Sequence, residues 1–277
     1  MSAPALRDNQ AKFVTGSTMR HVISMTVTGS IGLIAVFFVD ALNLLYISML
    51  GKEELSASIG FASTLLFFTT SVAIGLTIGT SALVARALGR GDREAAAKAG
   101  GGALVLSGII VTLVTLCVLP FLSPLVSFLG ATGRTHDLTV QYMQWVLPSS
   151  PLIAIGMGAS GILRGVGDAR RAMMITLIGA IIAAILDPIL IFGLGLELKG
   201  AAITTIVSRA AILVVGLYGA WFVHRLVKLD GLVSIKQMAR PFFAIGIPAI
   251  ITQLATPIGN AYVTIEMAKF GDDAVAR

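Results

Sequence analysis

The sequence predicts an all-α integral membrane protein, with a six-helix transmembrane lobe followed by the first helix of a second lobe. Hydrophobic residues make up 56% of the 277 residues and charged residues only 12%, against about 25% in soluble domains. The apolar residues also gather into runs of about 20 or more, the length that crosses a bilayer as a helix. Composition and run length both argue against an ordinary soluble domain.

About seven membrane spans can be drawn from these runs. They cover residues 22–49, 55–84, 101–122, 143–162, 173–194, 201–223 and 242–268. Most of the 20 basic residues fall before the first span or after the second, fourth and sixth spans, so the positive-inside rule predicts a cytoplasmic N-terminus. The net charge of +6 therefore orients the chain in the membrane, and we expect no nucleic-acid partner.

The first span carries Asp40 near its middle and Asn43 one turn further on. An acidic side chain at mid-bilayer costs about 2.5–3.5 kcal/mol on insertion scales, so such residues usually handle an ion, a proton or a cationic substrate. Residues three apart share a helix face, which makes Asn43 part of the same candidate site. The alternatives are that Asp40 reaches the headgroups and that Asn43 bridges two helices.

The loops after the second and fourth spans share a Gly-x-Gly-Asp pattern that ends in Asp92 and Asp168. Glycine permits a positive φ where a helix ends, and the aspartate can cap the next helix. Small-residue stretches at 75–79 and 156–161 indicate close helix packing. We expect structural roles for all of these segments.

The fifth and sixth spans hold further polar residues. Asp187 precedes Pro188, whose missing N–H interrupts the helical hydrogen-bond pattern beside the carboxylate. Such a break suits cation binding, although it could also mark the outer end of the helix. The sixth span offers hydroxyls, which usually bond to their own helix backbone, and an arginine that could pair with an acid or extend outward. These residues are Thr204, Thr205, Ser208 and Arg209.

The chain divides at a polar, basic stretch after the sixth span. We expect residues 1–225 to form the first lobe, 226–240 a cytoplasmic linker and 241–277 the start of a second lobe. The seventh span matches the first weakly, with Asn260 opposite Asp40 and Thr256 one turn earlier. Internal repeats of this kind build many secondary transporters. We therefore expect the sequence to be a fragment of a chain with a second six-helix lobe.

Several segments, in this order, resemble the multidrug and toxic compound extrusion (MATE) family. They are Val39-Asp40, Leu163-Arg-Gly-Val-Gly-Asp168, Leu186-Asp187-Pro188, Lys199-Gly-Ala-Ala-Ile-Thr-Thr205 and Gly246-Ile-Pro248. The resemblance implies two six-helix lobes and export of cationic or amphiphilic small molecules against proton or sodium influx. It also implies a bacterial-type cytoplasmic (inner) membrane as the location, no enzymatic activity, and no cofactor beyond the coupling ion.

The resemblance also assigns candidate residues. Asp40 matches the carboxylate of the family's first helix, Asp187 the fifth-helix acid of one branch, and Thr205 a sixth-helix hydroxyl of that branch's ion site. That branch usually has an asparagine one turn before the fifth-helix acid, but this sequence has Ala183 at that position. A bound sodium ion would therefore lack one oxygen ligand. We therefore expect proton coupling through Asp40, Asp187, Thr205 and Asn43. The candidate substrate-cavity residues are Asn260, Thr256, Gln253 and Arg209, and the expected partners are the substrates, the bilayer and the absent second lobe.

Two other functions fit parts of the sequence. A lipid-linked oligosaccharide flippase of the same superfamily would need several basic cavity residues for phosphate, and only Arg209 is a candidate. An intramembrane aspartyl protease would need its Gly-x-Gly-Asp aspartate inside a span, whereas Asp168 lies in a basic loop. The three histidines and Cys117 are too scattered to form a metal site, so export is the preferred function.

Overall fold

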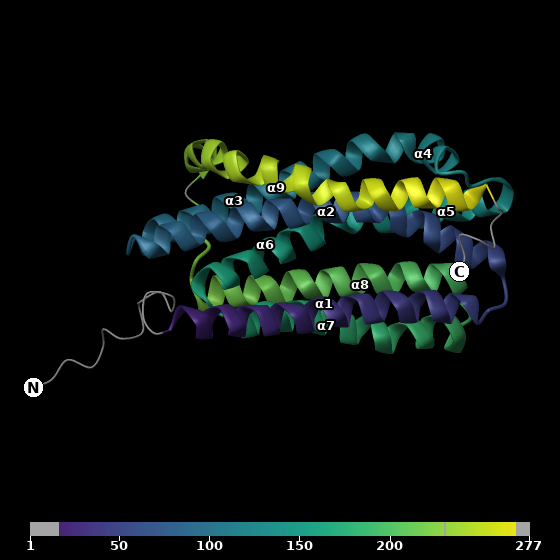
Figure 1. Cartoon of the computed structure of the whole chain (residues 1–277), viewed down its shortest axis with the longest axis horizontal. Helices are drawn as coiled ribbons and strands as arrows, with labels where there is room; N and C mark the ends of the chain where they lie inside the picture. Colours follow the sequence, from purple (N-terminus) through teal and green to yellow (C-terminus); the bar gives the residue numbers. More distant parts are fainter. Residues whose placement is uncertain (1–16, 230, 270–277) are drawn as a thin grey trace, which may run out of the picture.

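The computed structural model describes residues 17–229 and 231–269, and within them the chain is helical apart from short turns. Long helical segments run side by side along the longest axis of the molecule (Figure 1). They are α1 (Thr18–Ser48), α2 (Glu53–Gly89), α3 (Arg93–Val118), α5 (Gly133–Val146) with α6 (Ser150–Val166), α7 (Ala169–Pro188), α8 (Glu197–Leu217) and α9 (Gly231–Ala268).

Shorter pieces extend these segments. A 3-10 turn (Leu119–Phe121) and α4 (Leu122–Phe128) follow α3, and a second 3-10 turn (Leu147–Ser149) joins α5 to α6. π-helical turns continue α7 and α8 over Ile189–Gly193 and Tyr218–Val223. The first π turn comes directly after Pro188, which cannot donate the hydrogen bond that would continue a regular α-helix.

The predicted membrane architecture is confirmed. Six helical segments of the described residues are long and apolar enough to cross a membrane. The remaining long helix, α1, has 31 residues and is about 46 Å long at 1.5 Å per residue. Large apolar side chains such as Ile34, Phe38 and Val214 are 63–67% exposed, as expected for helices whose outer faces contact lipid rather than water.

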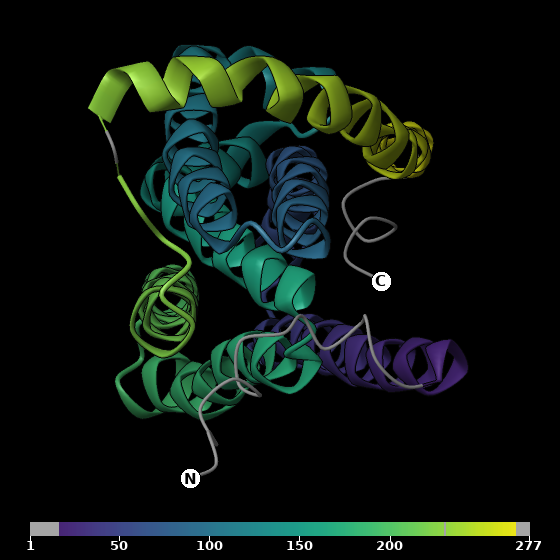
Figure 2. The same ribbon diagram turned by 90° about the vertical axis from the view of Figure 1, so that its left-hand side faces the viewer.

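The segments form two layers when viewed along their length (Figure 2). α2 lies in the first layer, packed against α3, α6 and α9, and α1, α7 and α8 form the second. α6 joins the layers because it contacts α2 and α3 on one side and α7 and α8 on the other. α1 packs mainly along α7, with a smaller contact to α2.

The two Gly-x-Gly-Asp turns have the structural roles expected of them. Gly91 and Gly167 take φ values of 75° and 89°, which only glycine adopts readily. Asp92 accepts a hydrogen bond from the backbone of Ala95 at 2.8 Å, and Asp168 caps α7 through the backbone N–H of Arg171 at 3.2 Å. These caps reverse the chain tightly between α2 and α3 and between α6 and α7.

The small-residue stretches are packing surfaces, as predicted. A Cβ atom at Gly161 would lie 2.8 Å from the backbone oxygen of Thr77, so α6 approaches α2 backbone to backbone. A Cβ atom at Gly75 would lie 2.5 Å from the side chain of Ile250 on α9. Near the opposite end of this seam the hydroxyls of Thr64 and Thr264 are 3.1 Å apart. α9 therefore lies along α2 over most of its length, and its helix begins at Gly231, within the stretch expected to be a linker.

Candidate ion-coupling site

The centre of the candidate site is Asp187, at the C-terminal end of α7. Its side chain is 0% exposed, and neither carboxylate oxygen has a hydrogen-bond partner among the described residues. Burying a carboxylate without compensation is costly, and a fold keeps one only where a proton or a cation can compensate it. The geometry is therefore that expected of a proton- or cation-binding group, and Asp187 remains the candidate that the sequence predicted.

The register between α1 and α7 brings Asn43 to the level of Asp187. The two helices run in parallel: Gly32 meets Thr176, and the rings of Tyr46 and Phe192 are 6.0 Å apart in an edge-on contact. Asn43 and Asp187 each lie eleven residues beyond the Gly32–Thr176 contact, which is about three helical turns and returns to the same face.

Asn43 adds a third unpaired oxygen to this level of the bundle, beside the two of the Asp187 carboxylate. Its Oδ1 atom is buried and has no described hydrogen-bond partner. Asp40 belongs to the same helix, one turn earlier, but its side chain lies outside the described part of the structure. The expectation that Asp40 shares the site with Asn43 and Asp187 accordingly stays a prediction.

α8 contributes hydroxyls from the other side of α7. Thr204 is 1% exposed and lies beside the Asp187 carboxylate, although its hydroxyl completes no hydrogen bond. One turn further on, the hydroxyl of Ser208 is also buried without a described partner. Asp187, Asn43, Thr204 and Ser208 are thus all side chains with buried oxygens that the described residues leave unpaired.

Thr205 is directed elsewhere. Its hydroxyl donates to the backbone oxygen of Ala201 at 2.9 Å and lies 3.4 Å from the hydroxyl of Tyr142 on α5. Adjacent residues of a helix point about 100° apart, so α8 presents Thr204 to α7 and Thr205 to α5. The sequence contained both hydroxyls but no signal that ranked Thr204 above Thr205.

Arg209 lies in the interior of the first lobe. Its side chain is 6% exposed, and one guanidinium nitrogen donates to the Val146 carbonyl at 3.0 Å and to the hydroxyls of Ser149 and Ser150 at 2.9 and 3.3 Å. These acceptors surround the break between α5 and α6 at Pro148. The contacts give Arg209 a structural role, that of tying α8 to this junction.

The three polar residues of α9 form a stripe on one helix face. Gln253, Thr256 and Asn260 are three or four residues apart, the spacing of neighbours on a helix surface. Gln253 is half-buried, and Thr256 and Asn260 are exposed. The stripe leads to Thr264, which contacts α2. Among the described residues no group of three or more His, Cys, Asp or Glu side chains gathers in the manner of a metal centre.

Membrane-length helices packed around a buried carboxylate define a multi-pass membrane protein. The chain belongs to the MATE family, because residues 30–189 match the MatE family model. It is 32% identical over 263 residues to an FAD transporter of Shewanella oneidensis, covering 93% of this chain and 58% of the relative. It is 26% identical to the multidrug export protein MepA of Staphylococcus aureus, with 98% and 61% covered. The chain thus spans about three-fifths of the length of these curated relatives.

Solved structures agree with this assignment. A MOP superfamily transporter from Pyrococcus furiosus superposes with a TM-score of 0.81 at 28% identity, over 90% of this chain and 55% of that one. An inward-facing MATE family transporter gives a TM-score of 0.77 at 27% identity, over 91% and 59%. Members of the family are transporters, so the expectation that the chain is not an enzyme is confirmed and the protease alternative is set aside.

Proposed function

We propose that the chain is part of a secondary active exporter of cationic or amphiphilic small molecules, driven by cation influx. The observation that carries the proposal is the buried, unpaired carboxylate of Asp187 at the level of Asn43, with Thr204 beside it. A site of this kind binds a small cation when it is accessible from one side of the membrane and releases it when it is accessible from the other.

The coupling ion in this proposal is the proton. A protonated carboxyl group needs one acceptor for its O–H, and Asn43 Oδ1 at the same level is available to accept it. Sodium would need several oxygen ligands held around it, and Ala183, one turn before Asp187, supplies none. Asp40 is proposed to act with this site, through the same face of α1 as Asn43.

The Asp187→Asn variant tests the site. The amide keeps the size of the side chain and removes its ability to take up and release a proton. Ethidium efflux from cells that make the full-length transporter should therefore be abolished at matched expression. The matched control is Asp137→Asn, which makes the same change at a carboxylate whose side chain is 83% exposed. Undiminished efflux in Asp187→Asn would exclude this carboxylate from coupling.

The ion is tested separately in proteoliposomes. Under an imposed pH gradient with sodium removed, substrate movement should continue, and it should stop when the pH gradient is collapsed. A strict requirement for sodium would reverse the choice of ion. Comparing Thr204→Val with Thr205→Val then asks which hydroxyl serves the site: the structure favours a larger loss in Thr204→Val, because only Thr204 lies beside Asp187.

The proposed orientation has a cytoplasmic N-terminus in the inner membrane of a bacterial-type cell. It is supported by the basic residues that follow α2, α6 and α8: Arg93, Arg171 and Lys228 lie at one end of the bundle, where they bond to His224, Asp168 and Glu94. Single cysteines introduced in a Cys117→Ser background test it. A cysteine at Arg90 should react with a membrane-impermeant maleimide only in inverted vesicles, and one at Lys52 only in intact cells; the reverse pattern would invert the topology.

The polar residues of α9 indicate the substrate class. The polar stripe of Gln253, Thr256 and Asn260 carries no charge and is proposed to line the cavity, which suits amphiphilic compounds. The 32% sequence identity to an FAD transporter provides a second candidate substrate class, dinucleotides. Uptake of a labelled substrate into inverted vesicles should discriminate between the two substrate classes. Inhibition of this uptake by ethidium alone supports amphiphilic compounds, and inhibition by FAD alone supports dinucleotides.

A further inference from the structure

The chain that leaves α8 does not cross the inside face freely but is pressed onto α3. Residues 224–228, here called the strap, follow the π turn that ends at Val223. A side chain at Gly100 would overlap the Leu226 carbonyl oxygen, and one at Gly101 would overlap that of Lys228. Leu226 is 0% exposed. Two adjacent glycines of α3 therefore form a notch into which the strap backbone fits.

Backbone hydrogen bonds hold the strap in this notch. The N–H of Lys228 donates to the Ala97 carbonyl of α3 at 3.0 Å, and the guanidinium of Arg93 donates to the His224 carbonyl at 2.7 Å. The N–H of Leu226 donates back to Ala220 at 2.9 Å. Satisfied backbone groups of this kind are typical of fixed structure rather than of a solvated linker.

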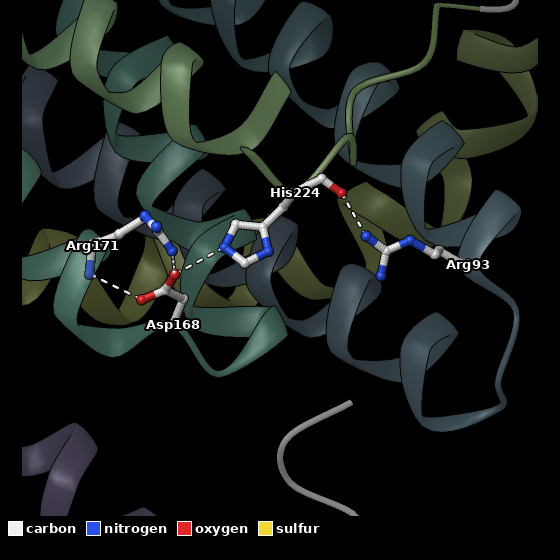
Figure 3. Close-up of polar contacts among 4 residues, drawn as sticks. All are labelled: Arg93, Asp168, Arg171 and His224. Atoms are coloured by element: carbon white, nitrogen blue, oxygen red, sulfur yellow. Dashed lines mark hydrogen bonds and ion pairs between the residues drawn. The ribbon is translucent and has the colours of Figure 1, made fainter. Parts of the chain in front are cut away.

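The His224 side chain attaches the strap to a second element, the turn between α6 and α7. Figure 3 shows its ring beside the carboxylate of Asp168, with 2.9 Å between Nε2 and Oδ2. Asp168 also receives the side chain and the backbone N–H of Arg171. Burial raises the pKa of Asp168, but the hydrogen bonds from His224 and Arg171 outweigh it, so the pKa lies below its ordinary value. The carboxylate thus stays charged and serves as a stable anchor.

We propose that residues 224–228 are a built-in part of the first lobe, so that the connection between lobes can pivot only beyond Lys228. The strap is fixed at three places: Gly100 and Gly101 from α3, Arg93 at its start and Asp168 from the α6–α7 turn. The pivot rests on the lobe motion of the proposed function. The fixed position of the strap does not depend on that motion. Movement of the second lobe then leaves the inside ends of α3, α7 and α8 undisturbed.

Hydrogen–deuterium exchange on the purified chain in lipid nanodiscs tests whether the strap is fixed. The Lys228 amide should be protected, and Gly101→Ala should speed exchange across residues 224–228 by roughly tenfold or more. Gly102→Ala is the matched control, because the next glycine of the same run meets only the Met238 side chain, at an ordinary 3.4 Å. Exchange of the parent strap at the rate of a free loop would overturn the proposal.

A gentler variant keeps the test valid if Gly101→Ala fails to fold. His224→Ala removes the contact with Asp168 and should raise exchange in the strap, while His224→Gln, which keeps an N–H donor, should restore part of the protection. Equal exchange in the parent and His224→Ala would remove Asp168 from the anchor and overturn that part of the proposal.

Spin-label distances test the pivot in nanodiscs that hold the complete transporter with both lobes, in a cysteine-free background that includes Cys117→Ser. Labels at Arg90 and Arg225 should give one distance that is unchanged between pH 5 and pH 8 and on adding ethidium, while labels at Arg90 and Lys236 should change. If the Arg90–Arg225 distance shifts together with the Arg90–Lys236 distance, the pivot is overturned. If the Arg90–Lys236 distance is unchanged, both the pivot and the lobe motion of the proposed function are overturned. The exchange experiment would still test, independently, whether the strap is fixed.

Discussion

Replacing Asp187 with asparagine should stabilise the fold while removing its function. Both carboxylate oxygens are buried and unpaired among the described residues, and a buried polar group without a partner costs about 1–3 kcal/mol; an uncompensated charge costs more. The asparagine amide is neutral, and the hydroxyl of Thr204 lies beside it as a possible donor to its oxygen. We therefore expect the free energy of unfolding to rise by about 1–3 kcal/mol.

Thermal unfolding of the purified chain in detergent at neutral pH measures this gain. For a chain of this size each kcal/mol corresponds to roughly 2–4 °C in Tm. Asp137→Asn, at an exposed position, should change stability by no more than about 0.5 kcal/mol. A lower Tm in Asp187→Asn would show that the carboxylate has a stabilising partner in the resting protein, and the reasoning that makes it a free coupling group would fail.

Three further results are expected from stability measurements. Gly75→Ala should destabilise the chain by about 1–3 kcal/mol because its Cβ overlaps α9, whereas Gly259→Ala, which meets nothing within 4 Å, should not; equal effects would argue against the α2–α9 seam. Arg209→Ala should cost about 3 kcal/mol by leaving buried acceptors unpaired, and Arg209→Met should recover part of it in chemical unfolding. The stabilisation lost in Asp168→Asn should be fully present above pH ~4, the ordinary range of aspartate, and should disappear as the pH falls through the lowered pKa of Asp168; a loss that begins at higher pH would contradict this.

The sequence predicts the helices well because a run of apolar residues is a local signal. The Gly-x-Gly-Asp turns are also local: the glycine φ and the cap lie within four residues of each other, and both form as expected. Asp187 could be selected as a site residue for the same reason, since its cost depends mainly on the apolar residues around it.

Contacts between distant residues could not be predicted in this way. The choice between Thr204 and Thr205 depends on the rotation of α8 against α7. Arg209 finds its partners more than fifty residues earlier in the chain, and His224 finds Asp168 across a similar separation. The notch at Gly100 and Gly101 is invisible in the sequence because glycines in a membrane helix usually indicate helix packing, and here they accept an extended segment instead.

α1 is held mainly along one neighbouring helix, and this limits the free energy needed to move it. α1 packs mainly along α7, and side chains such as Ile23, Val27 and Phe38 are more than half exposed. The binding of one ligand typically shifts a conformational equilibrium by only about 1–3 kcal/mol. A helix buried on all sides would resist so small a bias. Under the proposed mechanism, a shift of α1 would exchange few protein contacts for lipid contacts, so the free energy contributed by a single bound cation would be enough to move it.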